Sequence, residues 1–362
     1  MSLIEQNGIV LSDLERITQA NLPWSKLSNK IIMVTGGSGF LASYLVKSLL
    51  LANKKHGLNL KVICVIRNRK NVNRRLYNCS NHPNLEFIEQ DIGKTLREDF
   101  PRADYVIHSA SQASPKYYGT DPVGTLMANV EGTKNLLNHS VKEGCERFLF
   151  FSSGEVYGKP VNNEKQVTEI DYGYVDSMKV RSCYAESKRM GETMCAAWAK
   201  QYGIHTNVVR PFHTYGPGMA LDDGRVFADF VSDIVSKRNI VLKSDGMASR
   251  PFCYIADATI GFLTVLLKGE KTEAYNVGNP DAETTIKDLA MTLTRVFRDR
   301  NLRVEIQIPI ESNEYIKSPI ERSCPSIEKI KRIDWRPTTG IKEGFRRTVL
   351  SYEVPNKFNN EE

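Results

Sequence analysis

The sequence predicts an α/β fold in which a doubly wound parallel sheet is joined to a smaller α/β substrate-binding domain. From residue 30 to residue 210, short segments rich in β-branched and aromatic residues alternate with helical segments. A glycine-rich stretch separates the first of these strands from the helix that follows it. The alternation favours a parallel sheet, because each helix carries the chain back across one face of the sheet in a right-handed crossover.

The expected elements begin with a short helix at 12–20, inside a polar N-terminal extension. The strands that follow are short and apolar, and helical segments separate several of them. Beyond residue 215 the pattern becomes irregular, although we expect the chain to return to the sheet twice. The expected strands are 30–35, 61–66, 85–89, 105–108, 147–153 and 205–210, the main helices 122–142 and 182–202, and the returns 253–258 and 275–279.

These elements predict two interleaved domains between two terminal segments. The larger domain holds the sheet and the glycine-rich turn, and the smaller one holds the irregular part of the chain. The polar tail is expected to be frayed. The expected boundaries are 1–29 for the extension, 30–212 with 251–278 for the sheet domain, 213–250 with 279–352 for the smaller domain, and 353–362 for the tail.

Composition and charge are those of an ordinary globular chain, with 41% hydrophobic and 25% charged residues and a net charge of +7. The basic residues are interleaved with acids except at 67–75. This balance fits an anionic small molecule at least as well as nucleic acid, and we expect no nucleic-acid partner. The seven cysteines show no CxxC pair and no metal spacing. They predict reduced core thiols and no metal site.

Residues 1–17 contain no basic segment of the kind that opens a signal peptide, and no run of 18 apolar residues occurs in the chain. We therefore expect a cytoplasmic protein with no membrane partner.

The stretch TGGSGFLA is typical of a dinucleotide-binding Rossmann turn, since it places Gly36, Gly39 and Ala42 at regular spacing between a strand and a helix. The first glycine allows a tight turn, and the second lets the backbone approach a pyrophosphate at the helix N-terminus. Phe40 and Leu41 are expected to contact the same cofactor. The alternative is a turn with a purely structural role.

The end of the second strand, where an acid would bind the ribose 2′-hydroxyl of NAD, carries Arg67 and Arg69 instead. Guanidinium groups suit a 2′-phosphate, so the charge favours NADP. Alternatively, these arginines cover the adenine or face solvent. Asp91, after the third strand, is a candidate to face the adenine, or it is a plain loop acid.

Tyr184 and Lys188 lie four residues apart on an expected helix, so their side chains share one face. A tyrosine with its usual pKa of roughly 10 is a poor base at neutral pH. A nearby ammonium group and a positive nicotinamide ring would favour the phenolate. Lowering the pKa by about three units requires roughly 4 kcal/mol. Ser153, at the end of a strand, could donate a hydrogen bond to the same substrate oxygen. The alternative is an exposed helix face.

Together these residues resemble the extended short-chain dehydrogenase/reductase superfamily, also described as NAD-dependent epimerases and dehydratases. The resemblance covers 30–352 and rests on TGGSGFLA, HSAS, NVEGTKNLL, SSGEVYG, YAESK, RPFHTYGPG and YNVGN. ASQASPKYYGTDPVGT, VRSCYAESKR, DDGRVFADF and ASRPFCYIADA are most similar to segments of UDP-glucuronate decarboxylases. The resemblance implies a nucleotide-diphosphate sugar as substrate and a recycled nicotinamide cofactor, for which the family favours NAD.

The resemblance also implies that Tyr184 takes the proton of the sugar 4-hydroxyl while C4 is transiently oxidised, with Ser153 and Lys188 assisting. A decarboxylase then loses the C5 carboxylate, an epimerase turns the ketone over, and a dehydratase removes the C5 proton and the C6 hydroxyl. Glu155 matches a glutamate of decarboxylases and dehydratases, as a base or to position the ring, and the alternative is a salt-bridged acid at the rim. Gly154 replaces the aspartate of dehydratases, which disfavours dehydration unless Ser114 or a water replaces that acid. Decarboxylases have serine there.

The resemblance predicts a decarboxylase first, then a 4-epimerase or C4 oxidoreductase, and a 4,6-dehydratase third. It further implies two sets of contact residues. His213 stands where these families have asparagine, and it is either a sugar or diphosphate contact or only a packed ring. Arg250 could serve the sugar acid or the diphosphate. The implied cofactor contacts add Ile92, Ser109, Ala110, Ser111, Asn129 and Pro211, and the implied substrate contacts are Ser114, Tyr118, His213, Arg225, Val226, Arg250 and Arg322.

A non-catalytic dinucleotide-sensing regulator is the competing class of protein, although a sensor has no need for Ser153, Tyr184 and Lys188 together. The helices at 122–142 and 182–202 have apolar stripes beyond what one sheet face needs. The resemblance implies that such a pair packs against its twin in a four-helix bundle, so we expect a homodimer. The alternative is that the parent sheet covers both helices fully.

Overall fold

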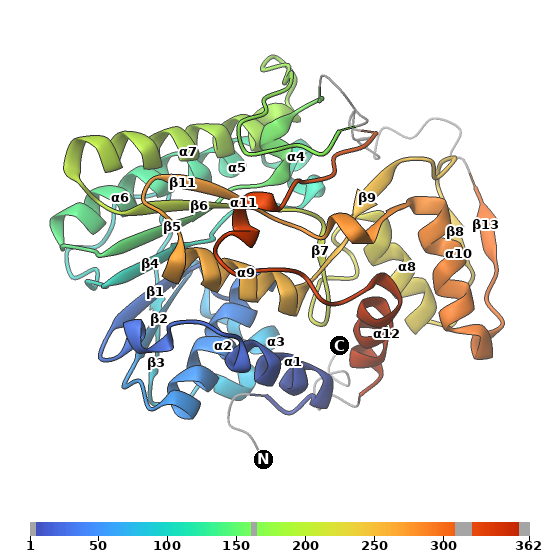
Figure 1. The fold of residues 1–362 in the computed structure, drawn as a ribbon, viewed down its shortest axis with the longest axis horizontal. Coiled ribbons are helices and arrows are strands. Elements are labelled where there is room, and N and C mark those ends of the chain that lie inside the picture. The colour runs from blue at the N-terminus through green and yellow to red at the C-terminus, as the bar shows by residue number, and fades with distance from the viewer. Residues whose placement is uncertain (1–4, 161–164, 308–320, 355–362) are drawn as a thin grey trace.

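A computed structural model describes residues 5–160, 165–307 and 321–354. Within these residues, a seven-stranded parallel sheet runs through the larger part of the molecule, in the order β11-β6-β5-β4-β1-β2-β3 (Figure 1). The predicted doubly wound sheet is confirmed. Its strands are β1 (Ile31–Thr35), β2 (Lys61–Ile66), β3 (Leu85–Glu89), β4 (Tyr105–His108), β5 (Arg147–Phe151), β6 (Thr206–Pro211) and β11 (Glu273–Val277).

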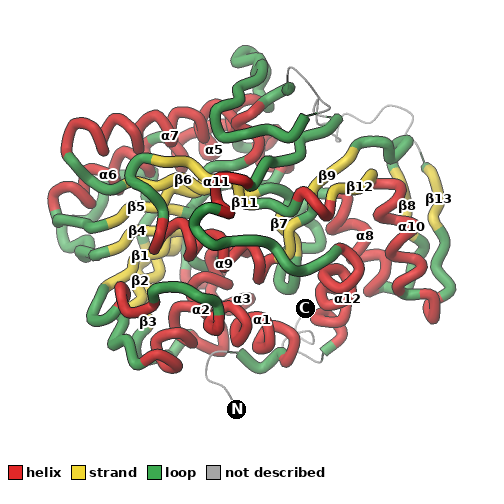
Figure 2. The backbone as a smooth tube through the Cα atoms, viewed as in Figure 1, coloured by secondary structure: helices red, strands yellow, loops and turns green. Residues whose placement is uncertain are grey.

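Strand order reverses at β1, which pairs with β2 on one side and with β4 on the other, both in parallel. Chain crossovers therefore leave β1 and β4 in opposite directions, and a crevice opens beyond their carboxyl ends. The central strands are apolar because helices cover both faces of the sheet, as the red and yellow layers of Figure 2 show.

Two groups of helices cover the two faces of the sheet. One face is covered by α2 (Phe40–His56) and α9 (Ile255–Lys268), and the other by α6 (Glu131–Lys142) and α7 (Ser182–Tyr202). The helix expected at 122–142 is instead two helices, because α5 (Pro122–Asn129) ends before Val130 and α6 begins after it. Short helices α3 (Val72–Arg75), α4 (Pro115–Thr120) and α11 (Glu328–Lys331) lie in the connections.

The N-terminal extension is packed into the molecule. Helix α1 (Gly8–Gln19) contacts α2, α9 and α12 (Ile341–Glu353), and its Leu14 and Ile17 are fully buried. The Asp13 carboxylate accepts hydrogen bonds from the Arg347 guanidinium at 2.7 Å and the Tyr254 hydroxyl at 2.6 Å. The extension therefore joins the helix layer of the sheet to the C-terminal helix.

The smaller part of the molecule is built on short strand pairs and helices. One expected return to the sheet, 253–258, is wrong: Cys253 and Tyr254 pair with β7 outside the main sheet, and α9 begins at Ile255. The other return is confirmed as β11. The remaining elements are β7 (Thr214–Tyr215), α8 (Val226–Val235), β8 (Ile240–Leu242), β9 (Ser249–Pro251), β10 (Cys253–Tyr254), β12 (Glu283–Thr285), α10 (Ile286–Val296) and β13 (Val304–Ile306).

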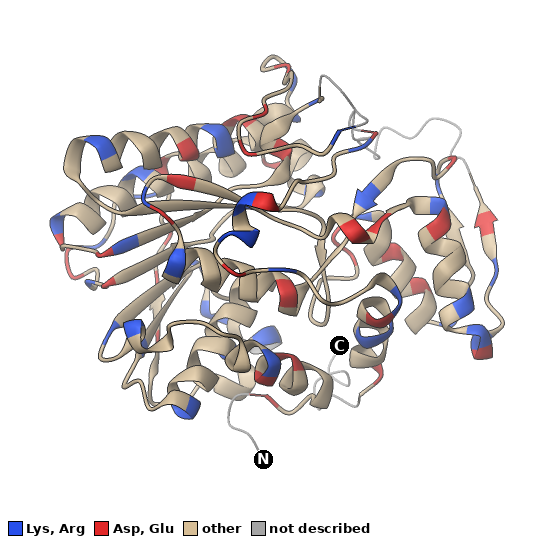
Figure 3. Cartoon of the chain, viewed as in Figure 1, with Lys and Arg blue, Asp and Glu red and all other residues tan. Residues whose placement is uncertain are grey.

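Charges of both signs are interspersed over the elements, as Figure 3 shows. All seven cysteines are buried, and none forms a disulfide. Among the described helices, none combines the length and the apolar character that crossing a bilayer requires. Most of the predicted tail, residues 355–362, lies outside the described residues.

Candidate active site

The glycine-rich turn joins β1 to α2 at the edge of the crevice. Gly36 has φ of 66°, and a Cβ atom there would lie 2.7 Å from the Cα of Ala110. A side chain is therefore excluded both by the left-handed backbone and by the loop that follows β4. Gly39 begins α2 without a side-chain cap, so the first backbone N–H groups of this helix remain available for an anion.

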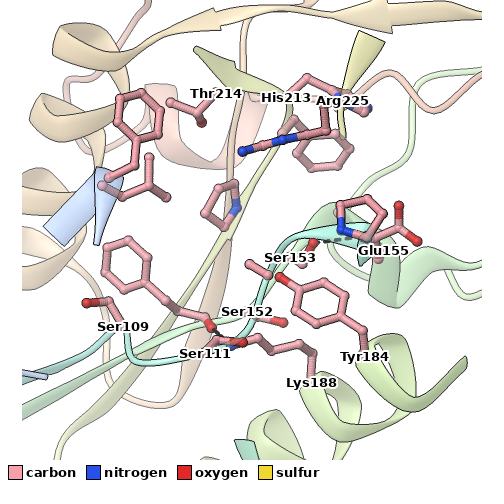
Figure 4. Close-up of a pocket in the computed structure, with 18 of the residues that line it drawn as sticks. Ser109, Ser111, Ser152, Ser153, Glu155, Tyr184, Lys188, His213, Thr214 and Arg225 are labelled. Carbon is pink, nitrogen blue, oxygen red and sulfur yellow. Dashed lines mark hydrogen bonds between the residues drawn. The ribbon is translucent and has the colours of Figure 1, made fainter. Parts of the chain in front are cut away.

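A cavity of about 270 Å³ opens beyond the ends of the central strands, next to this turn (Figure 4). Side chains from the turn, from the segments after β4, β5 and β6, and from α7 line it. It brings together all four residues expected to carry the chemistry, Ser153, Glu155, Tyr184 and Lys188. The other expected contacts in its lining are Gly36, Gly39, Phe40, Leu41, Ser109, Ser111, Tyr118, Pro211, His213, Arg225 and Arg250.

Tyr184 and Lys188 extend from the same face of α7 into the cavity, as expected from their spacing (Figure 4). The Lys188 ammonium lies 5.8 Å from the centroid of the Tyr184 ring, and it donates a hydrogen bond to the Phe151 carbonyl at 2.6 Å. This bond fixes the ammonium between the tyrosine and the end of β5. The Ser153 hydroxyl accepts a hydrogen bond from the backbone N–H of Glu155 at 3.2 Å.

The electrostatics of this group differ from the expectation. Burial raises the pKa of Tyr184 to about 12, while a hydrogen bond with Ser153 lowers it less than burial raises it. Burial also lowers the pKa of Lys188 to about 7, and the nearby Glu192 carboxylate opposes that shift. The sequence argument considered the charge of Lys188 but not the desolvation of both groups, and desolvation disfavours each charged form.

Glu192 lies one turn beyond Lys188 and joins α7 to two strands. It accepts two hydrogen bonds from the buried Arg210 guanidinium on β6, at 2.9 and 2.6 Å, and one from the Ser152 hydroxyl at the end of β5 at 2.5 Å. Arg210 also donates to the Tyr157 hydroxyl at 2.8 Å. This network fixes the position of α7 relative to the strand ends.

Glu155 forms an ion pair with a residue that sequence reasoning missed. Arg181, immediately before α7, donates from Nη1 to the Glu155 carboxylate at 3.1 Å, and both side chains line the cavity. The Arg181 guanidinium also lies 6.0 Å from the centroid of the Tyr118 ring. Its position one helical turn before Tyr184 could have identified it from the sequence.

The absence of a side chain at Gly154 has a packing reason. A Cβ atom there would lie 2.9 to 3.1 Å from three ring atoms of Phe212, which is 2% exposed. The ring thus occupies the space in which a serine or an aspartate would begin. The missing side chain of Gly154 and the ring of Phe212 therefore fit together in the cavity wall. The two residues are far apart in sequence, so the sequence alone does not indicate this contact.

Two further cations of the lining are Arg225 and Arg250. Arg225 forms two side-chain hydrogen bonds with Asp223, while Arg250 donates to the carbonyls of Ser249 and Glu321 at 2.6 and 2.9 Å. Burial, followed by the charges of these two arginines, holds the pKa of His213 well below its usual value, so its ring is neutral. His213 has φ of 30°, a left-handed conformation that asparagine adopts more readily.

The other expected contacts lie outside the cavity lining, and several have partners of their own. Arg322 forms a bidentate ion pair with Glu283, at 2.6 and 2.8 Å. The Ser114 hydroxyl donates to the Asp223 carbonyl at 2.6 Å. Asn129, which is fully buried, donates to Ser187 at 3.0 Å. Arg67 and Arg69 are exposed after β2, and the Asp91 carboxylate accepts a hydrogen bond from the Gly93 N–H. Ile92 packs against Gly132, and Ala110 packs against Gly36. Val226 is the first residue of α8.

Buried polar atoms without partners gather at the cavity. Within the described residues, Ser111 Oγ, Thr214 Oγ1, Ser323 Oγ and Arg181 Nε are buried, lack a hydrogen-bond partner and belong to its lining residues. Asn129 Oδ1, outside the lining, is also buried without a hydrogen-bond partner. Buried polar groups are normally paired, so these atoms fit a polar ligand such as a dinucleotide with a second phosphorylated molecule.

The fold and the cavity define a Rossmann-type α/β protein with a Ser–Tyr–Lys group beside its phosphate-binding turn. A family model described as "NAD dependent epimerase/dehydratase family" matches residues 32–278. UDP-glucuronic acid decarboxylase 6 of Arabidopsis thaliana is 34% identical over 319 residues, which are 88% of this chain and 87% of that protein. UDP-glucuronic acid decarboxylase 1 of Xenopus tropicalis is 32% identical over 358 residues, 97% of this chain and 80% of that protein.

Among solved structures, a UDP-glucose 4-epimerase of Thermotoga maritima with UDP-glucose is similar at a TM-score of 0.73 and 25% identity. The match covers 89% of this chain and 98% of that one. A UDP-glucuronic acid 4-epimerase of Bacillus cereus with UDP-glucuronic acid and NAD shares the fold at a TM-score of 0.74 and 21% identity, over 89% and 99% of the two chains. The chain belongs to the NAD-dependent epimerase/dehydratase family, which confirms the resemblance.

Proposed function

We propose that this protein decarboxylates a UDP-linked uronic acid through transient oxidation of the sugar at C4. The observation that carries the proposal is the convergence of Ser153, Glu155, Tyr184 and Lys188 in one cavity beside the phosphate turn. The decarboxylase relatives, similar over most of the chain, support it. A bound nicotinamide would accept a hydride from C4 and return it, so that no cofactor is consumed.

The chain's own residues have distinct tasks in this proposal. A bound, positively charged nicotinamide ring would oppose the burial that raises the pKa of Tyr184 and favour its phenolate. The phenolate oxygen then takes the proton of the 4-hydroxyl, and the Ser153 hydroxyl donates a hydrogen bond to the same substrate oxygen. Lys188, fixed by the Phe151 carbonyl, contributes positive charge beside the phenol. Glu155 faces the sugar at C5. Once C4 is a ketone, the C5–C6 bond breaks, its electron pair passes into the ketone as an enolate, and the carboxylate leaves as carbon dioxide. C5 then takes a proton from water before C4 is reduced again.

A 4-epimerase is the second candidate, since epimerisation needs no acid at position 154. Phe212 occupies the space beside Gly154, which disfavours the dehydratase that was ranked third.

The experiment is incubation of the purified protein with UDP-glucuronate and analysis of the products by mass spectrometry. A UDP-pentose product, lighter than the substrate by the mass of carbon dioxide, supports the proposal. An unchanged mass with a UDP-galacturonate product supports the epimerase, and loss of water supports the dehydratase.

Tyr184→Phe separates an enzyme from a dinucleotide-sensing regulator. An enzyme loses nearly all turnover in this variant while it keeps its dinucleotide affinity. If the variant turns over UDP-glucuronate like the wild-type protein, the role proposed for Tyr184 is wrong. If the wild-type protein binds a dinucleotide but converts no sugar in a panel of UDP-, dTDP-, GDP- and CDP-sugars, the regulator is favoured.

We further propose that Arg67 and Arg69 let the protein accept NADP. Both side chains are exposed at the end of β2, and the charge of Arg67 acts on the Asp121 carboxylate. The Glu89 carboxylate, which accepts from the Arg69 backbone N–H at 3.3 Å, lies in the same region and would suit the ribose hydroxyls of NAD. Replacing both arginines with alanine should weaken NADP binding and leave NAD binding unchanged in a titration of each dinucleotide.

We also propose a homodimer formed through α5 and α7. These two helices pack side by side, and they expose Val123, Met127 and Met190 by 64%, 41% and 49%. Apolar side chains exposed on adjacent helices fit a helical interface between two copies. Sedimentation velocity of the wild-type protein should give a dimer, and Val123→Glu with Met190→Glu should give a monomer. A wild-type monomer would contradict this proposal.

A further inference from the structure

One edge of the Arg181 guanidinium group lacks a hydrogen-bond partner. Its Nη1 donates to Glu155 at 3.1 Å. Its Nε is buried without a hydrogen-bond partner, and no hydrogen bond among the described residues uses its Nη2. The Nε–H and Nη2–H groups of an arginine point in the same direction and match the two oxygens of a carboxylate. Arg181, a residue of the cavity lining, therefore has two adjacent donors, Nε and Nη2, without a hydrogen-bond partner among the described residues.

The position of this edge is fixed by its surroundings. The guanidinium lies 6.0 Å from the centroid of the Tyr118 ring, and that ring is stacked on Tyr184. The Glu155 carboxylate holds the other side of the group, and the side chain of Arg181 is only 20% exposed. A guanidinium that is held in this way loses little conformational freedom when it binds a ligand.

Charge makes Arg181 necessary for one class of ligand. Glu155 is the one carboxylate among the described lining residues, and by itself it would repel an anionic sugar. Its ion pair with Arg181 compensates that charge. The other arginines have different surroundings: Arg225 is engaged by Asp223, and Arg250 by two backbone carbonyls.

We propose that Arg181 is the specificity-determining residue for a carboxylate on the sugar, which it binds through its Nε and Nη2 edge while Nη1 holds Glu155. A neutral sugar leaves this edge unpaired and gains nothing from it. The inference rests on the proposed function, because it assumes that a nucleotide sugar occupies the cavity. It goes further in that it assigns the selection of uronic acids to a residue outside the Ser–Tyr–Lys group.

The test compares the binding of UDP-glucuronate and UDP-glucose by isothermal titration calorimetry for the wild-type protein, Arg181→Met and Arg181→Lys. We expect Arg181→Met to weaken UDP-glucuronate binding by about 10- to 100-fold, since charged hydrogen bonds contribute about 1.5 to 3 kcal/mol. Binding of UDP-glucose and of UDP should change by less than about threefold. Arg181→Lys keeps the positive charge but loses the paired N–H donors of the guanidinium group. Its affinity for UDP-glucuronate should lie between those of the wild-type protein and Arg181→Met.

Arg346→Met is the matched control, because it removes an ion-paired arginine, the partner of Glu343, from the surface of α12. It should leave both affinities unchanged. Thermal melting and UDP binding of each variant establish that it is folded.

Equal losses for UDP-glucuronate and UDP-glucose in Arg181→Met would overturn the inference, since Arg181 would then have a structural role only. Adding Glu155→Gln gives a further test. If Arg181 binds the carboxylate directly, Arg181→Met still weakens UDP-glucuronate binding in the Glu155→Gln background. If the loss disappears there, Arg181 acts only by compensating Glu155, and direct binding is wrong. A wild-type protein that binds no nucleotide sugar contradicts the proposed function itself, which is a distinguishable result.

Discussion

The rings of Tyr118 and Tyr184 are stacked, with centroids 5.0 Å apart and an angle of 18° between the planes. The Tyr118 hydroxyl donates to the Ala113 carbonyl at 3.0 Å, and its ring is 3% exposed. The stack therefore connects α4 to α7, and it limits the rotation of the proposed base.

This contact predicts different effects for two substitutions of Tyr118. Tyr118→Phe keeps the stack and should leave kcat within about threefold of the wild-type value, because only one neutral hydrogen bond is lost. Tyr118→Leu removes the stack, and misorientation of Tyr184 should lower kcat by about 10- to 100-fold. Steady-state kinetics with UDP-glucuronate measures both, and a Tyr118→Leu variant with wild-type kcat would show that the ring does not position Tyr184.

Gly154→Ser should destabilise the protein, because its Cβ would contact the buried Phe212 ring. We expect a loss of about 1 to 3 kcal/mol in the free energy of unfolding, typical of overpacking. Phe212→Leu removes the clash, so the double variant should be more stable than the sum of the two single changes predicts, by about 1 kcal/mol. Urea unfolding gives the free energy of unfolding of the wild-type protein, the two single variants and the double variant. Additive changes would mean that the two residues do not compete for the same space.

Lys188→Met should inactivate the protein and make it more stable at neutral pH. The folded pKa of Lys188, about 7, lies below the unfolded value of 10.5, so the unfolded chain binds more protons between these pH values. The wild-type protein therefore gains stability from this group as pH rises from 7 to 10.5. The advantage of the methionine should be about 1 to 3 kcal/mol at neutral pH, after the loss of the hydrogen bond to Phe151, and should shrink at alkaline pH.

Denaturant unfolding at several pH values checks this prediction, and Lys200→Met, an exposed change on the same helix, is the control. A Lys188→Met protein that is less stable than the wild type at every pH would show that the burial of the ammonium carries no cost.

Glu192→Gln should destabilise the protein by about 3 kcal/mol, because it leaves the buried Arg210 guanidinium without its carboxylate. Loss of this charge also removes the influence that opposes the lowered pKa of Lys188. Chemical unfolding measures the first effect. Glu186→Gln is the matched control on the same helix, since its ion pair with Arg189 is longer, at 3.6 Å, and more exposed. Its effect should stay within about 0.5 kcal/mol.

The sheet and the Ser–Tyr–Lys group could be predicted because each depends on a local pattern. The glycine spacing after β1 and the four-residue spacing of Tyr184 and Lys188 are visible within one short segment. The error at 253–258 has a local cause too: an apolar segment that opens a buried helix has the same composition as a buried strand. The break at Val130 has no proline beside it, and Asn129 and Gly132 are the weak helix-ending signals near it.

The rest could not be predicted because it depends on contacts between distant segments. Arg322 forms a salt bridge with Glu283, 39 residues away in sequence, and no local pattern indicates that pairing. The space beside Gly154 is occupied by a ring 58 residues further along the chain (212 − 154). The pKa values of Tyr184 and Lys188 depend on burial, which appears only when the cavity is closed by segments from several strands.

Helix α1 bonds to the far end of the chain: Asn7 donates to the Ser351 carbonyl at 2.8 Å, and Arg347 to Asp13 at 2.7 Å. During synthesis α1 emerges long before α12, so Asn7 lacks its Ser351 partner and Asp13 its Arg347 partner until the C-terminal helix has been made. The strands of the main sheet end at Val277, so all of them are made before α12. The contacts between the first helix and the last are thus among the latest that the growing chain can make.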